Sequence, residues 1–292
     1  MTTQHPIDQA RRTPGRTRSV ANGAIVARLV VVQLALTALL AAGSPAAVAG
    51  GPTVGDLGRA LHVSAAATLS PQPSPTTAPP VSTTWTIGSS LQGRTIVLES
   101  FGSGSRRILV VGGVHGNEYG GPIAAQFAKY LRAHPSVLAS GTQIDVVAYA
   151  NPDGWALKRR TNARGVDVNR NFPSRNWRRG RRTGSSPVRR AGSEPETRAL
   201  IALLAEQRYV RVVSLHSRIG VVDYDGKGGY TLARRIARAS RYRVTRLSAH
   251  ATYRGSMGSY VPERFHIPIV TWELAKPAFT YRVLAGLLAS VK

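Results

Sequence analysis

The amino-acid sequence predicts an α/β domain in which helices cover both faces of one β-sheet. Two observations lead to this fold class. Short runs of β-branched and other apolar residues alternate along the chain with longer segments that repeat apolar residues at helical spacing. The chain is also long enough, at 292 residues with 42% hydrophobic residues, to bury a sizeable core.

Five short apolar runs have the composition of buried strands. The expected strands cover residues 94–100, 107–112, 143–150, 210–215 and 267–273. Four other segments show helical spacing, and the expected helices cover residues 121–134, 194–206, 231–240 and 281–291. In sheets of this kind the ligand binds beyond the carboxyl ends of the strands, so functional residues are expected there.

The first 84 residues are expected to lie outside this domain. A basic region precedes an uncharged apolar stretch at residues 29–42, and small residues follow up to Ala49, which is the pattern of a secretory signal peptide at residues 1–49. The alternative is a membrane anchor through residues 29–42, although a spanning helix needs about 20 apolar residues. Residues 50–84 are rich in Ala, Ser, Thr and Pro and predict a linker. The folded domain is then residues 85–292, and the protein is expected to be secreted or associated with the cell wall.

The composition excludes several classes of protein. The chain has no cysteine, which excludes a disulfide scaffold, a thiolate zinc site, an iron–sulfur cluster and a cysteine nucleophile. Its 39 Lys and Arg against 14 Asp and Glu give a formal net charge of +25. Such a charge indicates anionic surroundings, such as nucleic acid, anionic lipid or an anionic cell wall.

Polar residues suited to metal chemistry follow three of the expected strands. His115 and Glu118 come after the second strand, His216 ends the fourth, and Glu273 ends the fifth. Two histidines and one glutamate are the open zinc set, with three protein ligands and a fourth position left to water. A further glutamate nearby can take a proton from that water.

The segment between these strand ends carries longer motifs. In chain order the sequence reads GSSLQGR, GGVHGNE, NPDGW, GVDVNRNFP, GSEPET, SLHS, GSMGSY and TWEL, from about residue 87 to 274. With these motifs the chain resembles the zinc carboxypeptidase family, especially its compact bacterial branch of murein peptide amidases and γ-D-glutamyl-diaminopimelate peptidases. The resemblance implies a single domain with a mixed, mostly parallel twisted sheet and one Zn²⁺ per chain.

The resemblance also implies roles for particular residues. The zinc ligands are matched by His115, Glu118 and His216, and the general base by Glu273. The pair that holds the terminal carboxylate of the substrate is matched by Asn169 and Arg170; a guanidinium can bind a carboxylate through two hydrogen bonds. The arginine that stabilises the oxyanion is matched best by Arg160, with Arg159 as the alternative.

Two further positions are expected to contact substrate. Tyr253 is the candidate for the tyrosine that covers the substrate, with Tyr260 as the alternative. Met257 stands where the family lines its specificity pocket, and an uncharged residue there argues against a pocket for Lys or Arg side chains.

The region from residue 158 to 190 is unusually basic, with 12 Lys and Arg and one acid. It is either a solvated loop or a surface that attracts anionic cell-wall polymer or a carboxylate-rich peptide. Nucleic acid is a poor match, because one basic loop with one Trp in an exported protein is not a nucleic-acid signature.

These observations predict an exported zinc metallopeptidase that acts near a C-terminal carboxylate, on peptidoglycan stem peptides at the γ-D-Glu-diaminopimelate bond. The alternatives are a general zinc carboxypeptidase on ordinary peptides, a succinylglutamate or aspartoacylase-type deacylase, and a wall-binding module without activity. Cleavage at a terminus and cleavage within a chain both stay open at this point.

Overall fold

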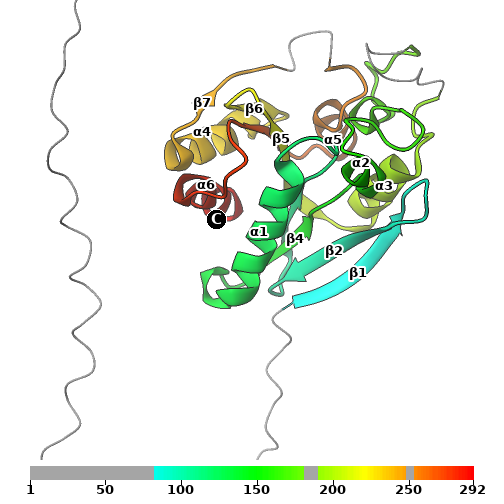
Figure 1. Ribbon diagram of the computed structural model, residues 1–292. Helices are drawn as coiled ribbons and strands as arrows, with labels where there is room; N and C mark the ends of the chain where they lie inside the picture. Colours follow the sequence, from blue (N-terminus) through cyan, green and yellow to red (C-terminus); the bar gives the residue numbers. More distant parts are fainter. Residues whose placement is uncertain (1–81, 181–189, 248–252) are drawn as a thin grey trace, which may run out of the picture. The chain divides into compact units, whose positions relative to one another are not determined.

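A computed structural model describes residues 82–180, 190–247 and 253–292, and in these residues the chain forms one mixed sheet of eight strands (Figure 1). The strands are β1 (Ser82–Ser89), β2 (Thr95–Phe101), β3 (Arg106–Val111), β4 (Thr142–Val147), β5 (Tyr209–Ser217), β6 (Val221–Asp225), β7 (Arg243–Val244) and β8 (Ile269–Leu274). The helices are α1 (Gly120–Ala133), α2 (Pro152–Ala156), α3 (Pro195–Glu206), α4 (Gly229–Ser240), α5 (Met257–Phe265) and α6 (Tyr281–Val291). Two short 3₁₀ turns, η1 (Pro135–Val137) and η2 (Val168–Arg170), complete these regions.

The strands lie in the order β1-β2-β4-β3-β5-β8-β6-β7. The central strands β4, β3, β5 and β8 are parallel to one another, as are β6 and β7. The pairs β1 with β2, β2 with β4 and β6 with β8 are antiparallel. The expected α/β class with a mixed, mostly parallel sheet is therefore confirmed.

Helices cover both faces of the sheet (Figure 1). One core lies under α1, α4 and α6, and includes Phe127, Ile236 and Leu287 packed against strand residues such as Trp272. A second core lies under α3 and α5 on the other face, and includes Leu200. The apolar strands are buried on both faces, which explains their continuous hydrophobic sequences.

All five expected strands and all four expected helices are present, with ends that differ by at most three residues. Strands β1, β6 and β7 and helices α2 and α5 were not expected. β1 is a largely exposed edge strand, β6 carries two acids in its five residues, and α5 contains Pro262. Each lacks the apolar periodicity on which the sequence analysis relied.

The expected signal peptide and membrane anchor, and the linker up to residue 81, lie outside the described residues, so the domain boundaries stay a prediction. None of the helices in the described regions combines the length and apolar character that a bilayer span requires.

Two glycines allow close packing where the chain leaves β3. A Cβ at Gly120 would lie 1.9 Å from the Leu215 carbonyl oxygen on β5, and a Cβ at Gly116 would lie 1.8 Å from the Gly154 carbonyl carbon. Both distances are far below contact, so only glycine fits. The loop between β3 and α1 is thereby held directly over the end of β5.

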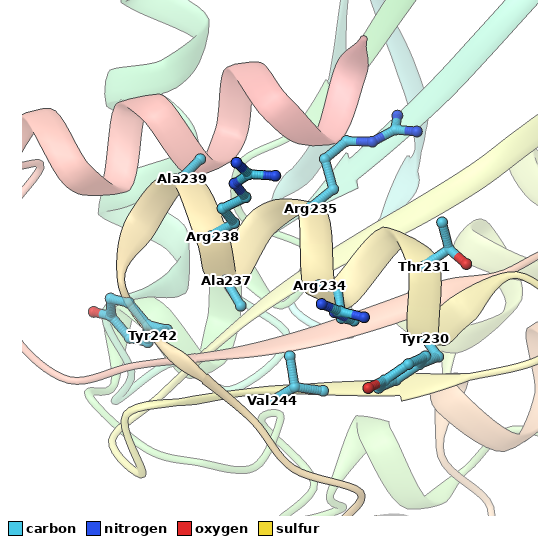
Figure 2. Close-up of a pocket in the computed structure, with 9 residues that line it drawn as sticks. All are labelled: Tyr230, Thr231, Arg234, Arg235, Ala237, Arg238, Ala239, Tyr242 and Val244. Atoms are coloured by element: carbon cyan, nitrogen blue, oxygen red, sulfur yellow. The ribbon is translucent and has the colours of Figure 1, made fainter.

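A broad cavity of about 920 Å³ lies along the outer side of α4 (Figure 2). Figure 2 shows Tyr230, Arg234 and Val244 near one another, and Arg235 and Arg238 on the side of α4 toward α6. It is lined by no histidine or acid, so it lacks metal-binding side chains.

Candidate metal centre

The candidate metal centre lies at the edge of the sheet where β3 and β5 end. These two strands are parallel neighbours, so their carboxyl ends meet. His115 and Glu118 lie in the loop between β3 and α1, and His216 lies near the end of β5. The Nδ1 atoms of the two histidines are 3.1 Å apart. The Glu118 carboxylate oxygens lie 2.8 Å from Nδ1 of His115 and 2.9 Å from Nδ1 of His216. The structure thus brings the three expected ligands together, and all three are buried.

Hydrogen bonds on the far side of each imidazole orient these ligands. Nε2 of His115 lies 3.1 Å from Oδ1 of Asp167, and Nε2 of His216 lies 3.1 Å from Oγ of Ser214. An imidazole that donates from Nε2 presents its Nδ1 lone pair to the cavity. Two such lone pairs and a carboxylate then face one another, an arrangement that a cation between them stabilises.

The residues present therefore fit zinc. Two imidazole nitrogens and one carboxylate are the donor set of catalytic zinc sites, and the partners Asp167 and Ser214 supply the outer hydrogen bonds that such histidines use. Carboxypeptidase is the standard example of this His₂Glu set.

Two carboxyl groups at the centre, those of Glu118 and Asp167, have lowered pKa values. Burial raises the pKa of Glu118, but His115 and His216 outweigh it and hold that pKa well below its ordinary value. Burial likewise raises the pKa of Asp167, and His115 and Arg160 reverse this effect, so its pKa is also lowered. Burial lowers the pKa of His115, but the charges of Glu118 and Asp167 and their hydrogen bonds to the ring outweigh this effect, so the pKa is raised. Both carboxyl groups are ionised and attract a divalent cation.

Glu273 lies beside the three ligands, on β8. It is the register partner of His216 on the neighbouring strand β5. The side chain is 8% exposed, and its Oε2 has no hydrogen-bond partner among the described residues. Burial raises the pKa of Glu273, opposed by His216 and reinforced by the charge of Glu118. A buried carboxylate that holds a proton more tightly than a solvated one is suited to accept and return it.

Arg160 faces the same cavity, and Arg159 is exposed outside it. The Arg160 guanidinium donates from Nη1 to Glu118 Oε1 and from Nε to Asp167 Oδ2, each at 3.0 Å. These two carboxylates hold the guanidinium at the edge of the metal centre. Of the two adjacent arginines, the structure thus places Arg160 where a reacting group can meet it.

The expected carboxylate clamp lines the cavity as well. Asn169 belongs to η2, and its Oδ1 accepts a hydrogen bond from the Met257 backbone at 2.8 Å. Arg170 follows it, donates from Nη1 to the Asn169 carbonyl at 2.6 Å, and stacks its guanidinium 5.3 Å from the ring centre of Tyr253. Tyr253 lines the cavity, whereas Tyr260 is 6% exposed and packs against Phe172 in the core.

The structure corrects the expectation for Met257. Its side chain is 1% exposed and belongs to the core under α5, and it does not line the cavity. The helix turns this position inward, and the next residue, Gly258, faces the cavity instead. The argument that an uncharged Met257 disfavours basic side chains therefore loses its premise.

Three acids of the cavity region escaped the sequence analysis. Asp167 supports His115 and Arg160 as described, and its place within the GVDVNRNFP motif was the available signal. Asp223 and Asp225 on β6 line the cavity, which has a volume of about 230 Å³. Their strand was not expected, so no signal pointed to them.

Some of the described arginines in the basic region pair with acids of the protein. Arg164 pairs with Glu194, and Arg175 with Glu263. Residues 181–189 lie outside the described residues, so the expectation of a polymer-binding loop stays a prediction.

The fold and the donor set together define a metal-dependent hydrolase of the α/β class. The sequence profile described as "Zinc carboxypeptidase" matches residues 75–278, more than half of the chain. The chain therefore belongs to the zinc carboxypeptidase family, and its cofactor is zinc.

Known relatives include murein peptide amidases. The chain is 35% identical over 131 residues to murein peptide amidase A of Escherichia coli K12, covering 39% of this chain and 50% of that protein. It is 33% identical over 180 residues to the Vibrio campbellii protein of the same name, covering 58% and 69%. The match thus spans half the length of the Escherichia coli relative.

Solved structures agree with this assignment. The murein-tripeptide amidase of Escherichia coli O157 superposes with a TM-score of 0.55 at 27% identity, covering 70% of this chain and 91% of that one. Carboxypeptidase A of Helicoverpa armigera superposes with a TM-score of 0.62 at 20% identity, covering 73% and 68%, which shows the shared fold.

Proposed function

We propose that this protein is an exported zinc peptidase that hydrolyses the γ-D-Glu-diaminopimelate bond of peptidoglycan stem peptides. The observation that carries the proposal is one cavity that combines the His115, Glu118 and His216 donor set with Glu273 and the Arg170 guanidinium. Its similarity to murein peptide amidases favours a muropeptide over other peptides.

The chemistry follows from the placement of these residues. Zinc, when bound, supplies a Lewis acid that polarises the scissile carbonyl and increases the acidity of water. Glu273 takes a proton from the attacking water at its carboxylate as the new carbon–oxygen bond forms. The same carboxyl group returns the proton to the nitrogen as the carbon–nitrogen bond breaks, so the products are a carboxylate and an amine.

Arg160 and Arg170 orient the substrate at either side of this bond. Arg160 is held by Glu118 and Asp167. In the proposed reaction its guanidinium donates to the carbonyl oxygen, where negative charge develops in the transition state. Arg170, with Asn169, holds the free carboxylate of the residue that leaves. A guanidinium can do this with two parallel hydrogen bonds.

The location of the protein is part of the proposal. The basic N-terminal segment and the apolar residues 29–42 support export. The mature protein is then either cleaved after Ala49 and released, or held in the membrane by an uncleaved anchor. N-terminal sequencing of the protein from culture medium and from membranes distinguishes them: a start near Gly50 supports cleavage, and an intact segment 1–49 in membranes supports the anchor.

A basic surface also favours an anionic cell wall as the surroundings. We propose that the region 158–190 adds to the attraction of wall polymer or of carboxylate-rich peptides. Pull-down with purified wall polymer at low and high salt tests this, because electrostatic attraction weakens with salt.

Defined muropeptides test the proposed reaction. The zinc-loaded full chain is incubated with stem tri- and tetrapeptides, and the products are identified by mass. Release of diaminopimelate, or of diaminopimelyl-D-alanine, supports the proposal. Cleavage of ordinary L-peptides with muropeptides left intact indicates the general carboxypeptidase instead, and release of an acyl group from an N-acyl amino acid indicates the deacylase.

A further inference from the structure

A strongly basic segment lies apart from the metal centre, at residues 226–247. It covers α4 and β7 and contains seven Lys and Arg but no acid. All seven side chains are exposed: Lys227, Arg234, Arg235, Arg238, Arg241, Arg243 and Arg246. Within the described residues, no acid forms an ion pair with any of them. This segment therefore carries its positive charge without compensation from neighbouring acids.

The cavity along α4 is formed by part of this segment (Figure 2). Tyr230, Arg234 and Arg238 follow one another at intervals of four residues, so they are neighbours along the helix surface. Tyr242, just beyond the helix, lines the same cavity. We call these four residues the α4 surface. Because no acid lines the cavity, its charge and its two aromatic rings suit an anionic ligand rather than a cation.

Arg235 has a different role from its neighbours on α4. Its guanidinium donates to the Lys292 carbonyl at 2.7 Å, so it serves the packing of the fold. Arg234 instead lies 5.8 Å from the ring centre of Tyr230, within the range of a cation–π contact. Arg234 and Arg238 are like charges four residues apart, which destabilises a helix. An anion bound to both guanidinium groups removes this repulsion.

The basic segment reaches the edge of the sheet at which the metal centre lies. Val221 on β6 is the register partner of both Arg243 on β7 and Glu273 on β8. Arg243 is thus two strands away from Glu273, which places their backbones about 10 Å apart. A long ligand that follows α4 toward β7 therefore approaches the edge that carries the metal ligands.

We propose that the α4 surface binds an acidic polysaccharide in which each sugar unit carries a carboxylate. Arg234 and Arg238 each bind one carboxylate through the paired donors of the guanidinium. Tyr230 and Tyr242 present large ring faces on which the apolar faces of sugars pack. The two arginines are about 6 Å apart along the helix, close to the length of one sugar unit, which favours an anion on every unit. This binding site is independent of the peptidase reaction and of the region 158–190.

Two glycans with the same backbone test the proposal. Oligogalacturonate carries a carboxylate on each sugar, and its methyl ester carries none. Fluorescence anisotropy with the labelled glycans and the full chain measures both affinities at about 0.15 M salt, where charges more than about 8 Å apart are largely screened. Oligogalacturonate should bind at least about 10-fold more tightly than the ester, because hydrogen bonds between charged groups are strong.

Paired variants assign the binding to the α4 surface. Arg234→Gln with Arg238→Gln should weaken oligogalacturonate binding by about 10-fold or more, because both charged donors are lost. The matched control is Arg198→Gln with Arg208→Gln, which removes the same charge from two exposed arginines on or just after α3. The control should change the affinity by less than about twofold, because screened charges far from the glycan contribute little. Melting temperatures and zinc contents show that each variant is folded, and Arg238→Gln alone should give a smaller loss in the same direction.

The other outcomes contradict the proposal. An unchanged affinity in the α4 variant, or an equal loss in the control, shows that overall charge alone attracts the glycan. Equal affinity for poly-L-glutamate, which has carboxylates but no sugar, removes the polysaccharide from the site. Tighter binding of single-stranded DNA that is lost in the α4 variant assigns the surface to nucleic acid instead. Cleavage of muropeptides is tested separately, so none of these results decides the peptidase function.

Discussion

At the scale of single residues, the buried carboxylate of Asp167 connects three parts of the site. It accepts a hydrogen bond from Nε2 of His115, another from Nε of Arg160, and a third from the Asn169 backbone at the start of η2. His115, Arg160, for which we propose the oxyanion role, and Asn169, which belongs to the proposed carboxylate clamp, therefore share one hydrogen-bond partner. Such outer partners orient metal ligands and raise their basicity.

Asp167→Asn should weaken zinc binding by about 10- to 100-fold, because the hydrogen bond to His115 loses its charged acceptor. Titration against a chelator of known affinity measures this. Asp153→Asn is the control, since Asp153 is equally buried but bonds Ser90 and the Gln92 backbone away from the metal donors. The control should lower the melting temperature without changing zinc affinity. Equal zinc affinity in the Asp167 variant and the unaltered protein would remove Asp167 from this role.

Glu273→Gln should separate binding from chemistry. Glutamine keeps the shape of the side chain but accepts no proton from water, so turnover should fall by about 10²-fold or more. Zinc content and substrate binding should persist, because the three metal ligands are unchanged. The measurements are turnover of a muropeptide, zinc by atomic absorption, and calorimetry with the substrate. Near-normal turnover would place the general base elsewhere.

At the scale of elements, the site depends on how closely helices approach the sheet. α6 lies over β8 at Gly286, where an added Cβ would stand 2.4 Å from Cη2 of the buried Trp272 and 3.0 Å from Cβ of Ser240 on α4. Trp272 immediately precedes Glu273 on β8. The glycine thus lets α6 pack closely against the strand that carries Glu273, the proposed general base.

Gly286→Ala should destabilise the fold by about 1–3 kcal/mol through overpacking. The sign of this change is informative, because alanine stabilises a helix by about 1 kcal/mol relative to glycine. Helix propensity alone would therefore make the variant more stable. Urea unfolding of the zinc-free protein measures the change. Ala285→Gly in the same helix is the matched control, with an expected loss of about 1 kcal/mol from helix propensity alone. A more stable Gly286→Ala variant would show that α6 does not pack tightly at this point.

At the scale of the whole molecule, most acidic side chains of the described residues are buried. Of the 14 acids, Asp8 and Asp56 lie outside the described residues, and eight of the remaining 12 are buried. Among the described residues, the charged side chains at the surface are therefore mostly basic, while acids such as Asp145 and Glu194 are hydrogen-bonded within the fold. Most acids of the described residues therefore serve the internal structure or line the metal-centre cavity.

The buried pair of Tyr209 and Asp145 should make the fold sensitive to high pH. The Tyr209 hydroxyl donates to Asp145 Oδ2 at 2.7 Å. Burial and the charge of Asp145 raise the pKa of Tyr209 above its ordinary value of 10.0. Its contribution to stability is complete below pH 10 and is lost as the pH rises, because the unfolded chain then releases the proton more readily.

Tyr209→Phe should reduce this dependence. Between pH 9 and pH 11 the free energy of unfolding should fall by about 1 kcal/mol more in the unaltered protein than in the variant. This difference is independent of how much the substitution itself destabilises the fold at pH 9. Urea midpoints of the zinc-free proteins at the two pH values measure the difference. Tyr281→Phe, an exposed tyrosine at the start of α6, should behave like the unaltered protein. Identical pH dependence in all three proteins would contradict the prediction.

Features that depend on residues close in the chain could be predicted from the sequence. The parallel strands and their helices followed from apolar periodicity, because burial on both faces of a strand demands it. His115, Glu118, His216 and Glu273 could be placed together, since each stands at the carboxyl end of a predicted strand and parallel strands end at one edge.

Tertiary structure decided the features that depend on which side chains meet across the fold. Asp223 and Asp225 lie on a strand with no apolar period, and only its pairing with β8 brings them to the cavity. Met257 and Gly258 are neighbours in sequence, yet the packing of α5 on the core sends one inward and the other to the cavity. Motifs and composition determined which chemistry the sequence predicts for this protein. Burial and charge pairing depend on contacts between segments that are distant in the sequence. Packing therefore decided the shape and the charge of the cavity.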